Sequence, residues 1–163
     1  MDKWLQGIHI QGVQVEPWAF REPFLDLAER FAPLPGTVLL MSGGDLDCAR
    51  YHILGVLPWL VFKGRHREIS LEIDGKIFSL KADAFDVLGR ILEACRIGHQ
   101  ETALPISAGL MGYFSYDLKD LLEILPRTSV DDLGLPHICL FCPSIILVHD
   151  KRQNQNWRFG RIV

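Results

Sequence analysis

Short apolar segments separated by turn signals most constrain how this chain folds. Apolar and polar residues alternate in Glu68 to Ile73 and in Lys76 to Leu80, and Asp74-Gly75 between these segments is a strong two-residue hairpin signal. A second polar turn, Asp150 to Asn156, joins a long apolar segment to a shorter one after it. These patterns predict antiparallel sheets built from hairpins.

Helical spacing of apolar residues occurs in only two principal stretches. Arg21 to Phe31 has the three-and-four spacing of a short amphipathic helix, with Pro23 in its first turn. A second helix is predicted over Asp83 to Arg96, with Asp83 as its N-cap and Gly98 ending it. The expected fold is therefore an α+β domain of antiparallel, sandwich-like β-sheets with two principal helices.

Length and charge limit the classes of protein that need considering. The 163 residues fit one domain, and 48% of them are hydrophobic, which is enough for a sizeable core. The net charge of -3 argues against nucleic-acid binding. No apolar run is long enough to span a bilayer and no signal pattern opens the chain, so we expect a cytoplasmic protein without membrane association.

The stretch from Gly36 to Gly55 brings several polar groups to one edge. Thr37 to Met41 reads as a buried strand, and a second strand is expected to start near Ala49 and to be interrupted at Pro58. Ser42 would leave the first strand where Arg50-Tyr51 enters the second. Such an edge can hold a small carboxylate-bearing molecule, although on spacing alone a polar hairpin end without a function is the favoured interpretation.

The four cysteines are assigned no metal or redox role. Cys139 and Cys142 have C-x-x-C spacing, but they lie inside an apolar run without a turn glycine. Residues three apart in a strand face opposite sides, so the two sulfurs would diverge. Buried free thiols are the favoured interpretation, and a metal or thiol-redox site is the alternative.

The segment Ser107 to Asp117 is the second informative stretch. Gly109 and Gly112 lie among apolar residues, which suggests close approach of another backbone. Asp117 is expected to cap a helix that ends before Pro126. Adjacent carboxylates at Asp131-Asp132 could be metal ligands, but the solvated interpretation is favoured.

Five motifs in this order resemble a known family, the N-terminal region of component I of anthranilate synthase and of aminodeoxychorismate synthase. They are Leu39-Leu40-x-Ser42, Arg50-Tyr51-x-Ile53-Leu54-Gly55, Gly109-x-x-Gly112-Tyr113-Phe114-x-Tyr116-Asp117, Glu123-x-x-Pro126 and Asp132-Leu133-x-Leu135-Pro136. Ser42-Gly43 after the Leu-Leu pair is more similar to the para-aminobenzoate branch.

The resemblance implies an enzyme that adds ammonia, supplied by a glutamine amidotransferase subunit, to chorismate with Mg2+. It also implies that the catalytic residues and the Mg2+ site lie in a C-terminal chorismate-binding domain, which would pack on one apolar face of this chain. Residues 1 to 163 would be a single N-terminal domain of a longer protein, without catalytic or metal-binding residues of its own.

The family's N-terminal domain carries a tryptophan pocket, a feedback site in anthranilate synthases. The matching positions in this chain are Leu40, Ser42, Cys48, Ala49, Arg50 and Tyr51. The chain departs from the family pattern at Met41 and His52. Because Met41 supplies no carboxylate, the ammonium group of a bound amino acid would need backbone carbonyls, Asp45 or Asp47 as acceptors.

Three functions stay open from the sequence. The first is the regulatory or structural domain of an aminodeoxychorismate synthase, in the para-aminobenzoate branch of folate synthesis. The second is the equivalent domain of an anthranilate synthase, in tryptophan synthesis. The third is a protein-interaction domain that binds no small molecule.

Overall fold

The computed structural model describes residues 3–44, 46, 48–97, 104–106, 108–121, 123 and 131–163. Its elements follow in the order η1 (Lys3–Gly7), β1 (Gly12–Pro17), α1 (Phe24–Phe31), β2 (Val38–Met41), β3 (Tyr51–Arg65), β4 (Glu68–Ile73), β5 (Lys76–Lys81), α2 (Ala84–Ala94), β6 (Met111–Phe114), η2 (Tyr116–Leu121), β7 (Ile138–Asp150) and β8 (Gln155–Ile162).

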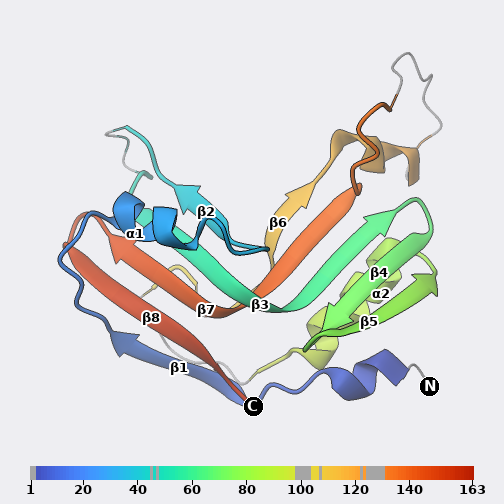
Figure 1. Ribbon diagram of the computed structural model, residues 1–163, viewed down its shortest axis with the longest axis horizontal. Helices are drawn as coiled ribbons and strands as arrows, with labels where there is room; N and C mark the ends of the chain where they lie inside the picture. The colour runs from blue at the N-terminus through green and yellow to red at the C-terminus, as the bar shows by residue number, and fades with distance from the viewer. Residues whose placement is uncertain are drawn as a thin grey trace.

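The described strands form one eight-stranded sheet in which every pairing is antiparallel. The main order is β1-β8-β7-β3-β4-β5, while β2 pairs with β3 and β6 pairs with β7. The expected α+β class with two principal helices is confirmed. The sandwich-like form arises from a single sheet that bends sharply into a V (Figure 1).

The bend lies where two prolines face each other on neighbouring strands. Pro58 of β3 is opposite Pro143 of β7, and the register shifts between Pro58 and Leu60. Leu57 has a φ of 53°, a left-handed conformation that is rare for a branched residue. The expectation that Pro58 interrupts the strand, with Trp59 to Phe62 forming a separate one, is therefore wrong. β3 absorbs the missing N–H in a bulge and continues to Arg65.

The bend divides the sheet into two arms, joined by β3 and β7. The first arm consists of β1, β8, β2 and the halves Tyr51–Val56 of β3 and Ile145–Asp150 of β7. The second arm consists of β4, β5, β6 and the halves Leu60–Arg65 of β3 and Ile138–Cys142 of β7.

Helices and loops cover the two arms differently. On one face of the first arm, α1 packs Phe24, Leu27 and Ala28 on Leu54, Val56 and Leu147. On the opposite face, Ile97, Leu104 and Ile106 pack against a cluster formed by Val13, Ile146, Val148 and Phe159. On the second arm, the described residues cover one face, where α2 contributes Ala84, Val87 and Ile91 to the largest core cluster.

Both predicted helices are present, and one starts later than expected. Asp83 accepts hydrogen bonds from the backbone N–H groups of Phe85 and Asp86 at 2.8 and 3.2 Å, which confirms it as the N-cap of α2. α1 starts at Phe24 rather than Arg21, because Pro23 is extended and keeps the preceding residue out of the helix. Gly98 lies outside the described residues.

None of the described helices has both the length and the apolar composition needed to cross a membrane.

Both predicted hairpins are confirmed. Asp74 and Gly75 join β4 to β5 with φ values of 45° and 79°, as the favoured two-residue turn requires. β7 and β8 are paired from Ile145 to Asp150 across the second turn.

Arg161 of β8 connects the first arm to the second. Its guanidinium donates to both carboxylate oxygens of Asp74 at 2.8 and 3.0 Å and to the carbonyl of His9. The same group lies 3.8 Å from the ring centre of Trp59. These contacts lower the pKa of Asp74, chiefly through the Arg161 hydrogen bond, and they hold the β4–β5 turn against the end of β8.

The Gly112 position confirms one close backbone approach, whereas Gly109 does not. A Cβ at Gly112 would lie 2.0 Å from the carbonyl oxygen of Cys139, and a Cβ at Gly109 would meet nothing within 4 Å. The expectation for Asp117 is wrong, because η2 begins at Tyr116 and Asp117 lies inside it. Ser115 precedes this short helix, and its carbonyl accepts the N–H of Leu118.

Candidate functional site

A groove of about 410 Å³ opens where β2 ends beside β3. Antiparallel pairing places Met41 opposite His52 and Leu40 opposite Ile53, so Ser42 follows β2 directly beside the start of β3. The groove is lined by Leu39, Leu40, Met41, Ser42, Cys48, Tyr51 and Ile53. Four of the six predicted site residues, Leu40, Ser42, Cys48 and Tyr51, therefore lie together.

β2 is not the buried strand that its composition predicts. Leu39, Leu40 and Met41 are 36%, 49% and 47% exposed. Among the described strands β2 pairs with β3 alone, which leaves its other edge and much of its side-chain surface open. An apolar run signals a surface that needs covering, and the described chain does not cover this one.

Ser42 is fixed by two hydrogen bonds across the strand pair. Its hydroxyl donates to the carbonyl of Tyr51 at 2.7 Å, and its backbone N–H donates to Nδ1 of His52 at 3.2 Å. Because the hydroxyl proton is used, Ser42 Oγ keeps its lone pairs as acceptors for a ligand. His52, which appeared only as a departure from the family pattern, thus holds the groove's main polar residue.

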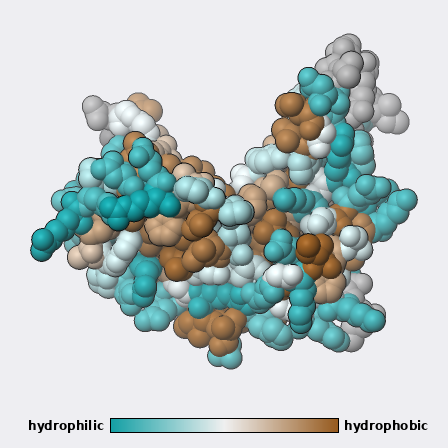
Figure 2. Space-filling view, viewed as in Figure 1, coloured by the Kyte–Doolittle hydropathy of each residue, from teal (hydrophilic) through white to brown (hydrophobic). Residues whose placement is uncertain are grey.

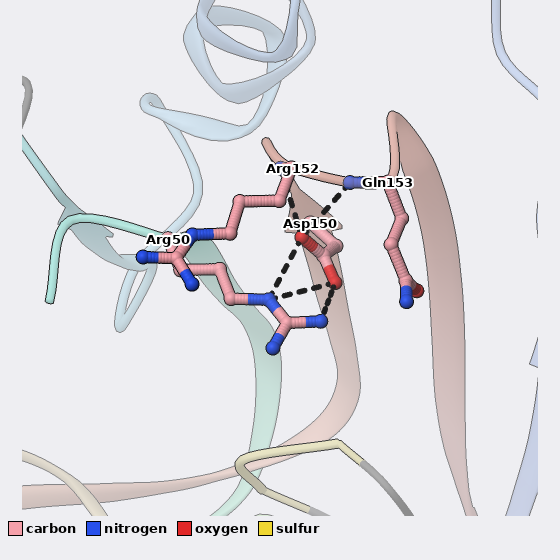
Figure 3. Close-up of polar contacts among 4 residues, drawn as sticks. All are labelled: Arg50, Asp150, Arg152 and Gln153. Atoms are coloured by element: carbon pink, nitrogen blue, oxygen red, sulfur yellow. Dashed lines mark hydrogen bonds and ion pairs between the residues drawn. The ribbon is translucent and has the colours of Figure 1, made fainter. Parts of the chain in front are cut away.

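Arg50 does not line the groove, because its guanidinium binds Asp150 (Figure 3). Nη2 lies 2.6 Å from Oδ2, and Nε lies 3.1 and 3.0 Å from the two carboxylate oxygens. Asp150 is 1% exposed and also accepts the backbone N–H groups of Arg152 and Gln153. The Arg50 hydrogen bond lowers the pKa of Asp150 and raises that of Arg50, so both groups carry full charge.

Tyr51 connects the ion pair to the groove. The Arg50 guanidinium lies 4.8 Å from the ring centre of Tyr51, a cation–π contact, and Tyr51 is a groove residue. Arg50 therefore meets the groove through the Tyr51 ring and is not itself among the lining residues. Ala49, the sixth predicted residue, does not line the groove either.

Three aromatic rings support the groove from behind. His52 stacks on His149 with ring centres 5.8 Å apart, and Phe24 of α1 lies 5.8 and 6.0 Å from the two imidazoles. Partial burial, followed by the charges of Lys151 and His149, lowers the pKa of His52, so its Nδ1 remains an acceptor at neutral pH. His149 is held in turn by Asn156 at 2.7 Å.

Lys151 adds a positive charge at the Ser42 end of the groove. Its ammonium donates to the carbonyl oxygens of Ser42 and Gly44 at 3.3 and 3.4 Å. Sequence reasoning missed Asp150 and Lys151, which lie 100 residues or more from their partners along the chain. The polar Asp150 to Asn156 turn was recognised, but only the β3–β7 pairing places it beside Arg50.

From the sequence we also expected Leu40 and the segment Gly109 to Phe114 to form the apolar walls of any ligand site beside Ser42. Leu40 lines the groove, but Gly109 to Phe114 does not. Met111 packs instead at the bend, where its sulfur would lie 2.6 Å from a Cβ at Gly55. Asp45 and Asp47, the alternative acceptors for a ligand's ammonium group, fall outside the described residues.

Cys139 and Cys142 face different surroundings. Both are buried and free. Burial raises the pKa of Cys142 to about 12, and it also raises that of Cys139, which lies near Lys63. Within the described part of the chain, no group of three or more His, Cys, Asp or Glu side chains could hold a metal ion. Asp131 pairs with Arg65 and accepts the N–H of Gly134 at 2.9 Å.

Comparison with known proteins places this geometry in a family. The chain is 34% identical over 115 residues to anthranilate synthase component 1 of Cereibacter sphaeroides and 30% identical over 141 residues to that of Acetivibrio thermocellus. These matches cover 68% and 85% of this chain. Aminodeoxychorismate synthase component 1 of Salmonella typhimurium is 33% identical over 135 residues, or 78% of this chain.

The chain is homologous to component 1 of the anthranilate and aminodeoxychorismate synthases. The resemblance read from the five motifs is thus confirmed. The fold agrees, since the crystal structure of anthranilate synthase component I from Streptococcus pneumoniae matches 83% of this chain with a TM-score of 0.54 at 22% identity. No family model matches the chain.

The matches cover only part of these relatives. The aligned regions amount to 23%, 28% and 30% of the three curated sequences and to 28% of the solved chain. The chain therefore spans less than a third of the length of the relatives it matches.

Proposed function

We propose that this chain is the N-terminal part of component 1 of a chorismate-aminating synthase and that it binds free tryptophan in the β2–β3 groove. The observation that carries the proposal is the groove itself, in which apolar walls from Leu40 and Ile53 meet the Ser42 hydroxyl and the Tyr51 ring. Apolar walls with a few placed polar groups are typical of small-molecule sites.

Each part of a free amino acid finds a matching group here. The indole would pack between Leu40 and Tyr51. The ammonium group would donate to the Ser42 Oγ lone pairs, whose own proton already binds the Tyr51 carbonyl. The carboxylate would face Lys151, whose ammonium sits on the Ser42 and Gly44 carbonyls at the end of the groove.

Packing on a chorismate-binding domain is the second part of the proposal. β2 and β6 lie on the inner sides of the two arms (Figure 1), and Figure 2 shows apolar surface on both arms and around the bend. Leu40 and Phe114 are 49% and 52% exposed, and Tyr116 is 81% exposed. Apolar side chains this open suit a domain interface, and a ligand between the interface and Ser42 would couple tryptophan to activity.

The chemistry itself belongs to the proposed C-terminal domain. The described residues do not fit a Mg2+ site, because no group of three acidic or other metal-ligating side chains comes together in them. We therefore assign chorismate, Mg2+ and the proton transfers to that domain, and the ammonia to a glutamine amidotransferase subunit. This chain would contribute packing and regulation.

The para-aminobenzoate branch of folate synthesis is our preferred assignment, on Ser42-Gly43 after the Leu-Leu pair. The anthranilate branch is the alternative, since relatives of both kinds match. The product formed from chorismate by the full-length protein, para-aminobenzoate or anthranilate, decides between them. The chain alone should consume no chorismate with Mg2+ and ammonium, and turnover by it would place the active site here.

Calorimetric titration with tryptophan tests the groove. We expect saturable binding that Ser42→Ala weakens about tenfold, because the substitution removes both the ligand's acceptor and the bond to Tyr51. Ser79→Ala on the second arm is the matched control and should bind as the parent does. Absence of heat with the parent chain would leave a protein-interaction domain without a ligand.

Cys48 offers an independent readout, because it is the exposed cysteine that lines the groove. Its alkylation should slow when tryptophan is added and should be unaffected by alanine. Protection by both amino acids, or by neither, would place the ligand elsewhere. This measurement needs no catalytic domain, so it is informative even if the proposed interface is wrong.

A further inference from the structure

The face of the second arm opposite α2 carries a cavity larger than the groove. It has a volume of about 530 Å³ and lies on β3, β4 and β5, with Gly134 and Pro136 forming a wall. The amino-acid groove lies on the other arm and shares no lining residue with it. None of the five family motifs supplies its floor.

Strand register places the polar side chains of this floor in two rows. Lys63, Ser70 and Ser79 are directly opposite one another on β3, β4 and β5 and therefore share a face. The next row on the same face is Arg65, Glu68 and Lys81. Because strands are about 4.8 Å apart, Lys63 and Lys81 lie on opposite sides of the floor, with the two hydroxyls between them.

The wall of the cavity is fixed by Arg65. One guanidinium nitrogen pairs with Asp131, and another donates to the carbonyl of Gly134 at 3.4 Å. The backbone hydrogen bond from Gly134, assisted by Arg65, lowers the pKa of Asp131. The charge of Arg65 is thus already balanced, and its role is to hold the wall beside the floor.

The two lysines provide the charge that a ligand would meet. Both are exposed, and across the ranges that the structure describes neither takes part in an ion pair. Glu68 is the acidic residue among the cavity's lining. Two cations against one carboxylate make this a locally positive cavity on a chain whose net charge is -3.

We infer that this cavity binds a small molecule with two anionic groups, carboxylate or phosphate, one held by Lys63 and the other by Lys81. The hydroxyls of Ser70 and Ser79 would donate to the ligand between them. This site goes beyond the tryptophan groove, and it lies on the face of the second arm opposite α2.

The experiment titrates the 163-residue chain at low ionic strength with succinate, pyrophosphate and acetate, followed by calorimetry. We expect succinate or pyrophosphate, each with two anionic groups, to bind at least tenfold more tightly than acetate, because a single carboxylate reaches only one lysine. Tighter binding of succinate than of pyrophosphate identifies a dicarboxylate ligand, and the opposite order identifies a ligand with two phosphate groups. Equal weak binding of all three would overturn the site.

Variants locate the binding. Lys63→Ala and Lys81→Ala should each weaken the tighter anion about tenfold, whereas Lys63→Arg should keep most of the affinity. Lys76→Ala is the matched control, since it removes the same charge from β5 outside the cavity. Equal affinity in the lysine-to-alanine variants and the control would overturn the assignment. An unchanged tryptophan titration shows that the variants are folded and separates this site from the groove.

Discussion

The two arms of the sheet bury their apolar side chains in different ways. The first arm is covered on both faces, by α1 and by the segment around Leu104 and Ile106. The second arm is covered on one face by α2, while its other face carries lysines and serines. The same two strands, β3 and β7, run through both environments.

This difference can be read in the residue patterns. β4 alternates strictly between exposed and buried positions, as a strand with one wet face must. The first-arm half of β3 is apolar at Ile53, Leu54 and Val56, because both of its faces are packed. The pattern of apolar and polar residues can therefore change within one strand at a bend. A single pattern assigned to the whole strand then gives the wrong burial for one of its halves.

The largest expected effect is the separation of β6 from the rest of the second arm. Gly112→Ala would place a methyl group 2.0 Å from the carbonyl oxygen of Cys139, so β6 must separate from β7. We expect a loss of at least about 3 kcal/mol in the free energy of unfolding, measured by urea denaturation. Gly89→Ala in α2 is the control, because nothing lies within 4 Å of its added Cβ and alanine favours a helix. Equal stability of both variants would contradict the close packing.

A moderate loss of stability is expected when the Arg50–Asp150 ion pair of the first arm is broken. Asp150→Ala removes a buried acceptor from two backbone N–H groups and from Arg50, and should cost about 2 kcal/mol. Arg50→Ala should cost less, because the backbone donors still satisfy Asp150. A larger loss of stability in Arg50→Ala than in Asp150→Ala would contradict the role of Asp150 as the shared acceptor.

The pH dependence of this pair follows from the lowered pKa of Asp150. Its stabilisation is fully present above the unfolded pKa of about 3.9 and is lost as pH falls through the folded value. Acid denaturation of the parent should therefore show a component that Asp150→Ala lacks, detectable by circular dichroism.

The smallest effect concerns His52, whose pKa is lowered. The folded state favours the neutral ring, so stability is present above the unfolded pKa of about 6.5 and falls as pH drops through the folded value. A protonated ring could no longer accept the Ser42 N–H. Melting temperatures from pH 7.5 to 5.5 should decline less in His52→Gln than in the parent. His9→Gln, on an exposed side chain, should behave as the parent does.

Local signals in the sequence predicted those features that a few adjacent residues determine. Asp83 caps α2 and Asp74-Gly75 turns the β4–β5 hairpin because both depend on neighbouring backbone atoms. The partners of Arg50 and Ser42 could not be predicted, since Asp150 and Lys151 reach them only through the register of β3 with β7. The Lys63–Ser70–Ser79 row depends on register in the same way.

The errors share a physical origin. Pro58 was taken as a strand end because proline lacks an N–H, but it faces another proline at a bulge, where the ladder is already interrupted. β2 was taken as buried because it is apolar, but burial depends on what covers a strand. Gly109 was expected to allow a close backbone approach for the same reason as Gly112, but nothing lies within 4 Å of a Cβ built at Gly109.

The pairing of β1 with β8 has a consequence for synthesis of the protein. Val13 lies opposite Arg161 and Val15 opposite Phe159, so the sheet partner that β1 has among the described strands is complete only when residues near 160 have been made. At roughly 5 to 20 residues per second, β1 waits on the order of ten seconds or more after its own translation. During that interval its two valines are open to chaperones and to proteases. Arrested nascent chains ending before residue 155 should therefore be cut near β1, and protection of those chains would show that β1 finds another partner first.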